Sequence, residues 1–554
     1  MRKTIFTACL LIATATQAQI LYVNNTDGTF QSIDTKLNDE VTFDAEQQLI
    51  RFTMNDGTSS QFATSGIKNI SPVSDNSREL IYDLNPKITF DASDADSYNE
   101  VVETIITDEF DDESGDFVEN YKPERTITIT FSETGVKTGS LPSDITATIE
   151  GSHIVINSER SKVAYRVTGK CSNGSLKIYS TKKFQIMAQN LSLTNPTGPA
   201  INIQSGKTVY FTLLNGTTST LCDGATYNAP VIAADGSEED QKGTLFSEGQ
   251  LIFNGEGTLN VTSLGGHGIC SDDYIRIRSG NINIVNAAKD GFRTKDKFIV
   301  GRTTTASPSI TINATNNGID CSEGTLTIEA GKLDIKSGGE AIKVEYEEIV
   351  PDPAVIPDAY IKGGYIKIAT TDEKSSAIKV TGNYTQSGGI IQATVGGNGS
   401  KIINCDGNAA FSGGKVTGFA TGTVAADTTS AGGIKCNGNL DITGGTIALE
   451  CNGKGSKGIN CDGNFTVTDG DLTFIAAGDN YTDIADDKKS RAITANSITV
   501  NGGRIVANAH DNAMTAIEGI TLNGGIINAY SNTSDALNLE AVQTGGWLLT
   551  KDAE

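Results

Sequence analysis

Acidic side chains recur at one position of three consecutive copies of a short repeat. Asp273, Asp296 and Glu323 each stand four residues after the apolar residue that marks their copy. If the copies stack, these carboxylates lie about 5 Å apart, which costs stability unless protons or a cation relieve the repulsion. Ca²⁺ prefers about six to eight oxygen ligands, so clustered carboxylates suit it. We therefore predict a Ca²⁺ site at this corner of the repeat.

A second column of oxygen donors stands two residues before the apolar residue of each copy. It contains Asp290, Asn317 and Glu340, with Asp272 and Asp320 close to it in the sequence. The full set of predicted metal ligands is Asp272, Asp273, Asp290, Asp296, Asp320, Glu323 and Glu340. The alternative is that Asp and Asn here form turns through their own side chains.

Basic residues lie beside these acids in the sequence. The predicted carbohydrate-binding residues are Arg276, Arg278, Arg293, Lys295 and Lys297. Guanidinium groups hold carboxylates with two parallel hydrogen bonds, so this patch and bridging Ca²⁺ together would bind an acidic polymer. A solvated face of mixed charge is the alternative.

The elements that position these residues are short strands. Apolar residues marking each copy recur at intervals of 20 to 36 residues, with Gly-Gly pairs at corners between them. Such copies are too small to bury an apolar face alone and must stack, which predicts a right-handed parallel β-helix. The marking residues are Ile269, Phe292, Ile319, Ile342, Ile378, Ile403, Ile434, Ile459, Ile493, Ile517 and Leu537.

Composition predicts an all-β chain, and the sequence divides into four parts. Sixty glycines against eleven prolines favour turn-rich β structure. Met1 to Ala18 is typical of a secretory signal peptide, because two basic residues precede an apolar run and a small-residue cleavage site. We expect a small β module at 19–78, an acidic linker at 79–125 and the β-helix at 126–554. No apolar run is long enough for a membrane span, and we expect a monomer.

The net charge of −24 is unevenly distributed. Residues 91–124 contain thirteen Asp or Glu and one Lys, which is half of the excess. We expect this stretch to be disordered or to project as a loop, and an acidic loop to protrude between Val344 and Tyr360. Such a chain is a poor partner for nucleic acid.

Eight cysteines follow the leader, an even number that in an exported protein suggests disulfides. However, Cys321, Cys405, Cys436 and Cys461 each stand two residues after an inward Ile. We therefore predict a ladder of free thiols inside the core.

Several phrases follow one another in an order that resembles a known family. They are Ala200-Ile201, Gly257 to Val261, His267 to Asp273, Lys289 to Asp296 and Asn317 to Asp320. Over about residues 126 to 540 the chain resembles the secreted carbohydrate-binding-domain β-helix family, similar in fold to pectate-lyase-like polysaccharide lyases. The resemblance implies binding of Ca²⁺ and acidic plant polysaccharide without lyase activity. Lys289 departs from the pattern, since it replaces a potential acidic ligand.

Two other functions remain open. A polysaccharide lyase would need a base near the sugar, for which Lys295, Arg293 and Lys343 are candidates, although nothing distinguishes them from binding residues. A structural or adhesive envelope solenoid is the third possibility. The three histidines lack metal-ligand spacing, and we predict no catalytic residue.

Overall fold

The chain divides into two compact units, Met1–Lys87 and Ile88–Glu554, and each is described by itself. The computed structural model describes residues 20–25, 30–34, 38–44, 49–54, 58–63, 65, 67–71, 86–108, 112–232, 236–302, 306–346, 355–482 and 487–553. The predicted signal peptide lies outside these ranges. Among the residues that the structure describes, the helices are too short and too polar to span a bilayer.

The first unit contains two small antiparallel sheets. One antiparallel sheet has the order β2-β1-β6, formed by β1 (Ile20–Asn25), β2 (Phe30–Asp34) and β6 (Ile67–Ser71). The other is β3-β4-β5, formed by β3 (Asn38–Asp44), β4 (Leu49–Met54) and β5 (Ser59–Ala63). Alternate residues such as Val23, Ile33, Ile50 and Phe52 are buried.

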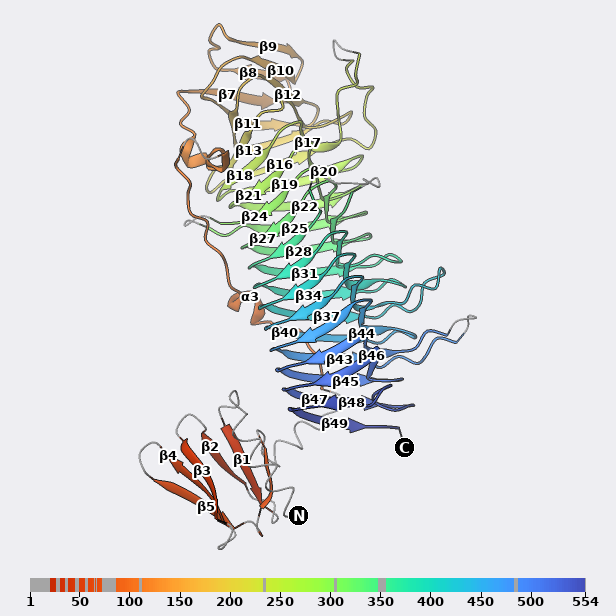
Figure 1. The fold of residues 1–554 in the computed structure, drawn as a ribbon. Helices are drawn as coiled ribbons and strands as arrows, with labels where there is room; N and C mark the ends of the chain where they lie inside the picture. The colour runs from red at the N-terminus through yellow and green to blue at the C-terminus, as the bar shows by residue number, and fades with distance from the viewer. Residues whose placement is uncertain are drawn as a thin grey trace. The chain divides into compact units, whose positions relative to one another are not determined.

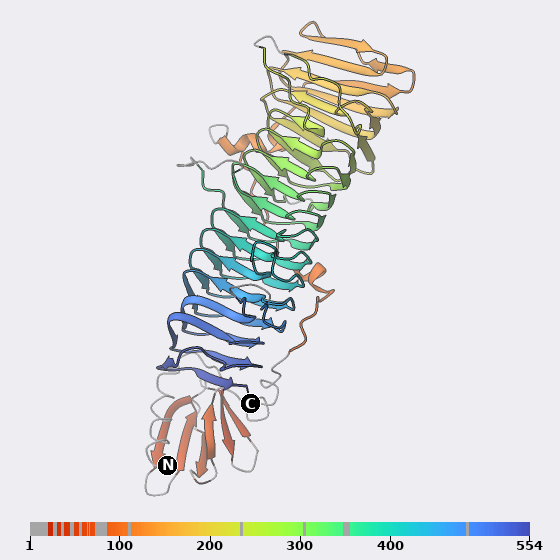
Figure 2. The ribbon, with the colours of Figure 1, turned by 90° about the vertical axis from the view of Figure 1, so that its right-hand side faces the viewer.

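The second unit is a parallel β-helix, as predicted (Figure 1). Each turn, or rung, contributes one strand to each of three parallel sheets, because a strand pairs with the strand one turn before it and the strand one turn after it. The stacking is visible side-on in Figure 2. At the N-terminal end, β8 (Gly135–Thr138) and β9 (Ile145–Glu150) instead pair antiparallel with β7 and β10.

Sheet 1 carries the repeated apolar residue of each rung. Its strands are β10 (His153–Ser158), β12 (Ser175–Ser180), β14 (Ile201–Gln204), β17 (Gly243–Ser247), β20 (His267–Ser271), β23 (Phe292–Thr294), β26 (Ile319–Cys321), β29 (Ile342–Val344), β32 (Ile378–Val380), β35 (Lys401–Cys405), β38 (Gly432–Cys436), β41 (Lys457–Cys461) and the first parts of β44 (Arg491–Val500) and β46 (Met514–Leu522).

Sheet 2 follows sheet 1 in each turn after a corner of a few residues. Its strands are β7 (Arg125–Ser132), β11 (Val163–Cys171), β13 (Phe184–Thr194), β15 (Val209–Leu213), β18 (Leu251–Gly255), β21 (Ile275–Ile277), β24 (Phe298–Val300), β27 (Leu326–Ile328), β30 (Ala359–Ile361), β33 (Tyr384–Gln386), β36 (Ala409–Phe411), β39 (Leu440–Ile442), β42 (Asn464–Val467), the later parts of β44 and β46, and β48 (Ala541–Gln543).

Sheet 3 closes each turn. Its strands are the ends of β11 and β13, then β16 (Thr218–Cys222), β19 (Thr258–Ser263), β22 (Asn281–Ala287), β25 (Ser309–Ala314), β28 (Lys332–Ser337), β31 (Tyr365–Thr370), β34 (Ile390–Val395), β37 (Lys415–Ala420), β40 (Thr446–Cys451), β43 (Asp471–Ala476), β45 (Arg504–Ala509), β47 (Ile526–Ser531) and β49 (Trp547–Lys551).

The register of sheet 1 explains why glycine precedes several of the repeated apolar residues. Ile269, Phe292 and Ile319 pair in consecutive rungs and are fully buried. A Cβ on Gly291, the residue before Phe292, would lie 2.7 Å from the carbonyl oxygen of Gly318 in the next rung. Glycine at this position therefore lets the rungs approach closely.

One predicted rung residue is wrong. Ile493 pairs with Met514, not with Ile517, whose side chain is 78% exposed. The small residue Ala513 precedes Met514, as Gly or Ala precedes the inward residue of most of the other rungs. That small-apolar pair was the better guide to the register than the Ile itself.

All eight cysteines of the described ranges are free thiols, as predicted. Cys405, Cys436 and Cys461 pair in consecutive rungs of sheet 1 and are buried in the core. They fill the interior as small apolar side chains.

The acidic stretch neither projects nor lies apart from the β-helix, contrary to expectation. Residues 88–124, which we call the strap, belong to the second unit and contain α3 (Asp94–Ser97), η2 (Asp112–Asp116) and η3 (Val118–Asn120). The strap contacts rungs from Phe419, where Phe90 packs at 4.9 Å between ring centroids, back to Val163, whose carbonyl accepts a hydrogen bond from Tyr121. Its path along the stack is visible in Figure 1.

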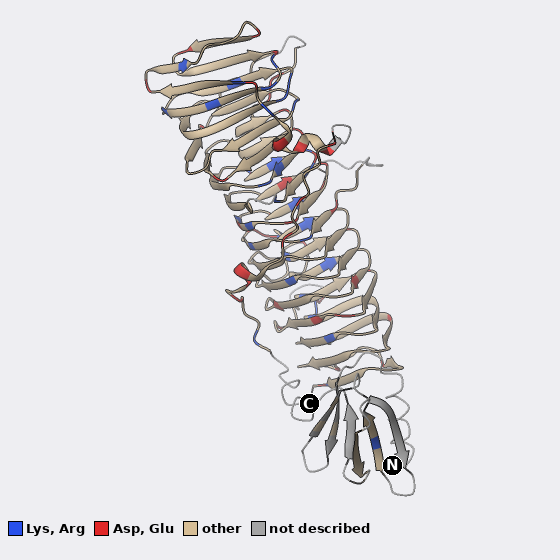
Figure 3. Cartoon of the chain, turned by 90° about the vertical axis from the view of Figure 1, so that its left-hand side faces the viewer, with Lys and Arg blue, Asp and Glu red and all other residues tan. Residues whose placement is uncertain are grey.

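The strap is bound by backbone as well as by charge. The N–H groups of Val101 and Glu103 donate to the carbonyls of Glu329 and Arg302, both at 2.8 Å. Side chains of the strap reach basic residues far along the chain, as Asp94 does to Lys415 at 2.8 Å. Figure 3 shows acidic segments of the strap beside basic positions of the strands that it crosses. Distant cations therefore compensate the local excess of negative charge.

Candidate metal and carbohydrate site

The predicted corner acids do stack. Ser271, Thr294 and Cys321 are in register at the ends of β20, β23 and β26. Two residues beyond them stand Asp273, Asp296 and Glu323, at the turn from sheet 1 to sheet 2. The β-helix register thus brings three carboxylates from consecutive turns to one corner.

These acids line an open pocket of about 370 Å³, which we call the acidic pocket. Its lining residues are Asp272, Asp273, Lys295, Asp296, Glu323, Tyr346 and Val355. The Tyr346 hydroxyl donates to the carbonyl of Val355 at 2.6 Å and so links the two sides of the loop that follows β29. Residues 347–354 of that loop lie outside the described ranges.

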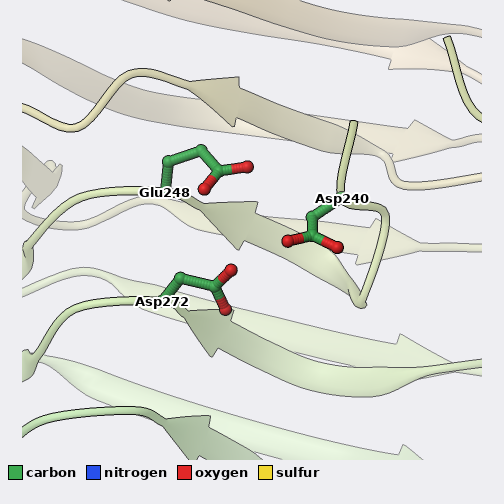
Figure 4. Close-up of side chains that lie close together, drawn as sticks. All are labelled: Asp240, Glu248 and Asp272. Carbon is green, nitrogen blue, oxygen red and sulfur yellow. The ribbon is translucent and has the colours of Figure 1, made fainter. Parts of the chain in front are cut away.

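A second acidic group lies directly beside the pocket. Carboxylate oxygens of Asp240, Glu248 and Asp272 all lie within 4.8 Å of one another (Figure 4). Lys242 Nζ forms ion pairs with Asp240 at 2.9 Å and Asp272 at 2.5 Å. Three carboxylate groups face one lysine, so negative charge remains in excess. This group, which we call the acidic triad, therefore has the oxygen donors and the charge to hold a metal ion.

The pKa values in this region move in the direction expected of crowded acids. Burial, together with Asp272 and Asp240, raises the pKa of Glu248 to about 7. Burial and the neighbouring Asp296 raise the pKa of Asp273, and burial raises that of Asp272. A divalent cation would stabilise the ionised forms of these carboxyl groups.

The second predicted column is a buried hydrogen-bond ladder, so Asp290 is not an open metal ligand. Asp290 is 1% exposed, and its Oδ2 lies 3.0 Å from His267 Nδ1. Its Oδ1 accepts from the Asn317 N–H at 2.9 Å and from Asn316 Nδ2 at 2.7 Å. In turn, Asn317 Oδ1 accepts from the N–H of Glu340 at 3.1 Å. The side chains thus hold the corners of consecutive rungs together, whereas the alternative had them form turns within their own corner.

Asp320 and Glu340 also stand apart from the acidic pocket. Asp320 is 2% exposed at the centre of β26, with an oxygen 3.8 Å from Lys343 Nζ. Glu340 is half-buried in the turn before β29. Of the seven predicted ligands, the structure brings Asp272, Asp273, Asp296 and Glu323 together and leaves the other three outside.

Two of the predicted carbohydrate-binding arginines are inaccessible. Arg278 is 1% exposed and binds Glu103 and Glu119 of the strap at 3.0 and 2.8 Å. Arg276 binds Glu103 at 2.7 Å and Asp116 at 2.8 Å, and is also buried. The strap therefore already supplies the carboxylates that these guanidinium groups were expected to take from a ligand.

The remaining basic residues lie on or near the open corner. Lys295 lines the acidic pocket, with Nζ 3.5 Å from Glu323 Oε1. Lys297 is exposed one residue beyond Asp296, and Arg293 is half-buried on the outer face of β23.

Sequence reasoning missed Asp240 and Glu248. Asp240 lies in the long connection between β16 and β17, where no repeat marks it. Glu248 follows β17 as Asp272 follows β20, because Ser247 pairs with Ser271. Asp272 stands three residues after Ile269, and the same offset from Leu245, one rung earlier, gives Glu248.

A comparison with protein families finds one match. The family model described as carbohydrate-binding domain-containing protein matches residues 150–480 and 437–536, which together span more than half of the chain. No curated protein matches.

Among solved structures, the chain is similar to one titled "Structure of the polysaccharide lyase-like protein from C. thermocellum, Gadolinium derivative". The identity is 18% and the TM-score 0.37, covering 52% of this chain and 96% of that chain. The family match is the finding that identifies the chain, which belongs to the carbohydrate-binding domain-containing proteins.

Proposed function

We propose that this protein binds an acidic, uronate-containing polysaccharide through Ca²⁺ held at the acidic pocket, without cleaving it. The observation that carries the proposal is the convergence of Asp273, Asp296 and Glu323, from three consecutive rungs, on one open pocket. Family membership supports a carbohydrate ligand.

Calcium suits the pocket by its donor chemistry. Carboxylate oxygens are hard ligands, and the Ca²⁺ ion accepts irregular sets of them with additional waters. The raised pKa of Asp273, caused by burial and by Asp296, indicates that these acids lack sufficient positive charge nearby. Asp272 would take part as a member of both the pocket and the neighbouring triad.

An open pocket also leaves coordination positions for a ligand. Sugar carboxylates would complete the coordination of the Ca²⁺ ion, and the exposed ammonium group of Lys295 stands at the same opening. A polyanion would then bind a protein whose net charge is −24, because the bound cation reverses the local repulsion.

The lysine candidates for lyase chemistry are not favoured by their surroundings. Lys343 Nζ lies 3.2 Å from Glu345, and its acidic neighbours raise its pKa despite its burial. A general base must lose its proton near neutral pH, so a raised pKa opposes that role. Lys295 lies 3.5 Å from Glu323 and has the same kind of acidic neighbour. We therefore propose a binding protein rather than an enzyme.

Polygalacturonate immobilised on beads tests the proposal. We expect retention of the whole protein in CaCl₂ and its loss in EDTA, with no ultraviolet absorbance from unsaturated product. Asp273→Asn with Asp296→Asn should abolish Ca²⁺-dependent retention, whereas the exposed Asp441→Asn should not. Rising product absorbance would show a lyase, and absence of retention in CaCl₂ would leave a structural solenoid.

We also propose that the protein acts outside the cytoplasm and as a monomer. The leader from Met1 to Ala18 supports export. Cell fractionation with sizing of the purified protein tests both points: a cytoplasmic protein or a stable dimer would contradict them.

A further inference from the structure

A small notch lies on the outer face of sheet 1, several rungs beyond the acidic pocket. We call it the lysine notch, and its lining residues are Lys401, Ser430, Ala431, Gly432, Gly433, Ile434, Lys435, Lys457 and Asn460. Its volume of about 20 Å³ admits one water-sized group. A carboxylate can enter it end-on, but a sugar ring must stay outside.

The register of the β-helix creates the notch. Lys401, Gly432 and Lys457 occupy the same position in β35, β38 and β41. Rungs stack at about 4.8 Å, so the two lysine backbones lie about 10 Å apart with a residue lacking a side chain between them. Lys435 adds a third ammonium group from the centre of β38. Three lysines thus line the notch around a glycine.

Two of these cations have no acidic partner. Lys401 Nζ donates to the carbonyl of Gly399 at 2.9 Å, and Lys457 Nζ donates to Asn460 Oδ1 at 3.2 Å. Within the part of the chain that the structure describes, neither ammonium group has a carboxylate within ion-pair distance. Only Lys435, of the three, has one, in Asp462. Half-buried and unpaired ammonium groups are costly, since burial penalises their charge.

The protonation of the notch reflects this shortage of negative charge. Burial and Lys435 lower the pKa of Lys401 to about 8. Burial and Arg491 lower the pKa of Lys457 to about 8. The charged groups facing the two lysines are Lys374, Lys379, Asp427 and Lys435 around Lys401, and Lys435, Asp462, Lys488 and Arg491 around Lys457. Cations outnumber carboxylates around both, so an anion would relieve the repulsion.

We propose that the lysine notch is a second carbohydrate subsite, which takes the carboxylate of a uronic acid between Lys401, Lys435 and Lys457 without a metal ion. The notch size selects a small group, and three lysines among its lining residues favour an anionic one. That the bound carboxylate belongs to a sugar rests on the proposed function. That the notch binds it without a metal ion does not.

The outer face of sheet 1 connects the notch to the acidic pocket. Its central column is mostly basic and contains, in register along the stack, Arg293, Asp320, Lys343, Lys379, Asn404 and Lys435. The rungs of Lys295 and Gly432 are five apart, about 24 Å at the usual strand spacing. A polymer running parallel to the β-helix axis would therefore reach both sites at once.

Titration calorimetry with a short oligogalacturonate in EDTA tests the notch separately from the Ca²⁺ site. We expect binding at pH 6.5 that weakens at least tenfold at pH 9.5, because both lysines lose their protons. Near pH 8, binding should take up protons from the buffer, since the bound carboxylate raises the lysine pKa values. Lys401→Gln with Lys457→Gln should weaken binding at pH 6.5 at least tenfold.

The controls separate the two sites and the two sources of a small anion. Lys367→Gln, at an exposed lysine of sheet 3, should change nothing, and Asp273→Asn with Asp296→Asn should retain binding in EDTA. If the double glutamine variant misfolds, Lys401→Met alone gives the same test. Binding that is unchanged in the notch variants or between the two pH values overturns the proposal, as does equal affinity for inorganic sulfate. If the protein binds the oligogalacturonate in EDTA but shows no Ca²⁺-dependent retention on polygalacturonate, the proposed function is refuted and the lysine notch is not.

Discussion

Removal of one strap carboxylate should release the strap from the β-helix. Glu103 binds Arg276 at 2.7 Å through one oxygen and Arg278 at 3.0 Å through the other, and all three side chains are at most 10% exposed. Breaking a buried ion pair from one side costs about 3–5 kcal/mol, because a charge remains buried without its partner. Asp116 and Glu119 still contact the two arginines, so we expect about 3 kcal/mol for Glu103→Ala.

Hydrogen exchange measures this cost locally, at the amides that the strap contributes. The N–H groups of Val101 and residue 103 donate to carbonyls of the β-helix and report strap opening. At 1.4 kcal/mol per tenfold change, about 3 kcal/mol accelerates their exchange by about two orders of magnitude.

The matched control is Glu124→Ala at the exposed end of the strap. Glu124 and Lys162 are 63% and 56% exposed, and such a pair contributes under about 1 kcal/mol. Exchange at Val101 should then change less than about fivefold. Equal effects of the two variants would refute the view that buried charge pairs hold the strap in place.

Two further predictions concern the rungs. Lys401 has a pKa of about 8 in the folded protein and an ordinary value of 10.5, so the unfolded chain binds more protons between these values and stability should rise from about pH 8 to about 10.5. Lys401→Met removes the cost of burying this charge, which is fully present below pH 8. The variant should be more stable by up to about 3 kcal/mol at pH 7 but by little at pH 10.5, as measured by urea unfolding. A gain in stability that does not depend on pH would contradict this. A Cβ on Gly324 would clash with the backbone oxygen of Asp296, whereas one on Gly206 would meet no atom within 4 Å. Gly324→Ala should therefore lower the Tm and the Ca²⁺ response and Gly206→Ala neither, and equal Tm values would show that the corner can relax.

The parts of the site that could be predicted are those fixed by the stacking register. Asp273, Asp296 and Glu323 share an offset from buried residues that pair with one another, so sequence spacing carries over to space. The register prediction was wrong at Ile517, where we followed an apolar residue and ignored the small residue that precedes the inward position of most rungs.

The strap could not be predicted, because its contacts join residues remote in sequence. Glu103 and Arg278 are 175 residues apart, and no local periodicity relates them. Arg276 lies on the outer face of sheet 2, but an outward side chain is exposed only when nothing covers the sheet. The acidic composition of residues 91–124 predicted a segment exposed to solvent. The arginines and lysines that compensate this charge are scattered over distant rungs, so the sequence around the segment does not reveal them.

The strap and the lysine notch together indicate which face the proposed polyanion would use. On sheet 2, Arg276 and Arg278 are neutralised by strap carboxylates and buried, so they offer no attraction to a ligand. On sheet 1, Lys401 and Lys457 have no carboxylate partner among the described residues, and their lowered pKa values reflect it. Coulombic attraction in a chain of net charge −24 must come from such unbalanced local clusters or from a bound cation. Both occur along sheet 1, at the lysine notch and, once Ca²⁺ binds as proposed, at the acidic pocket.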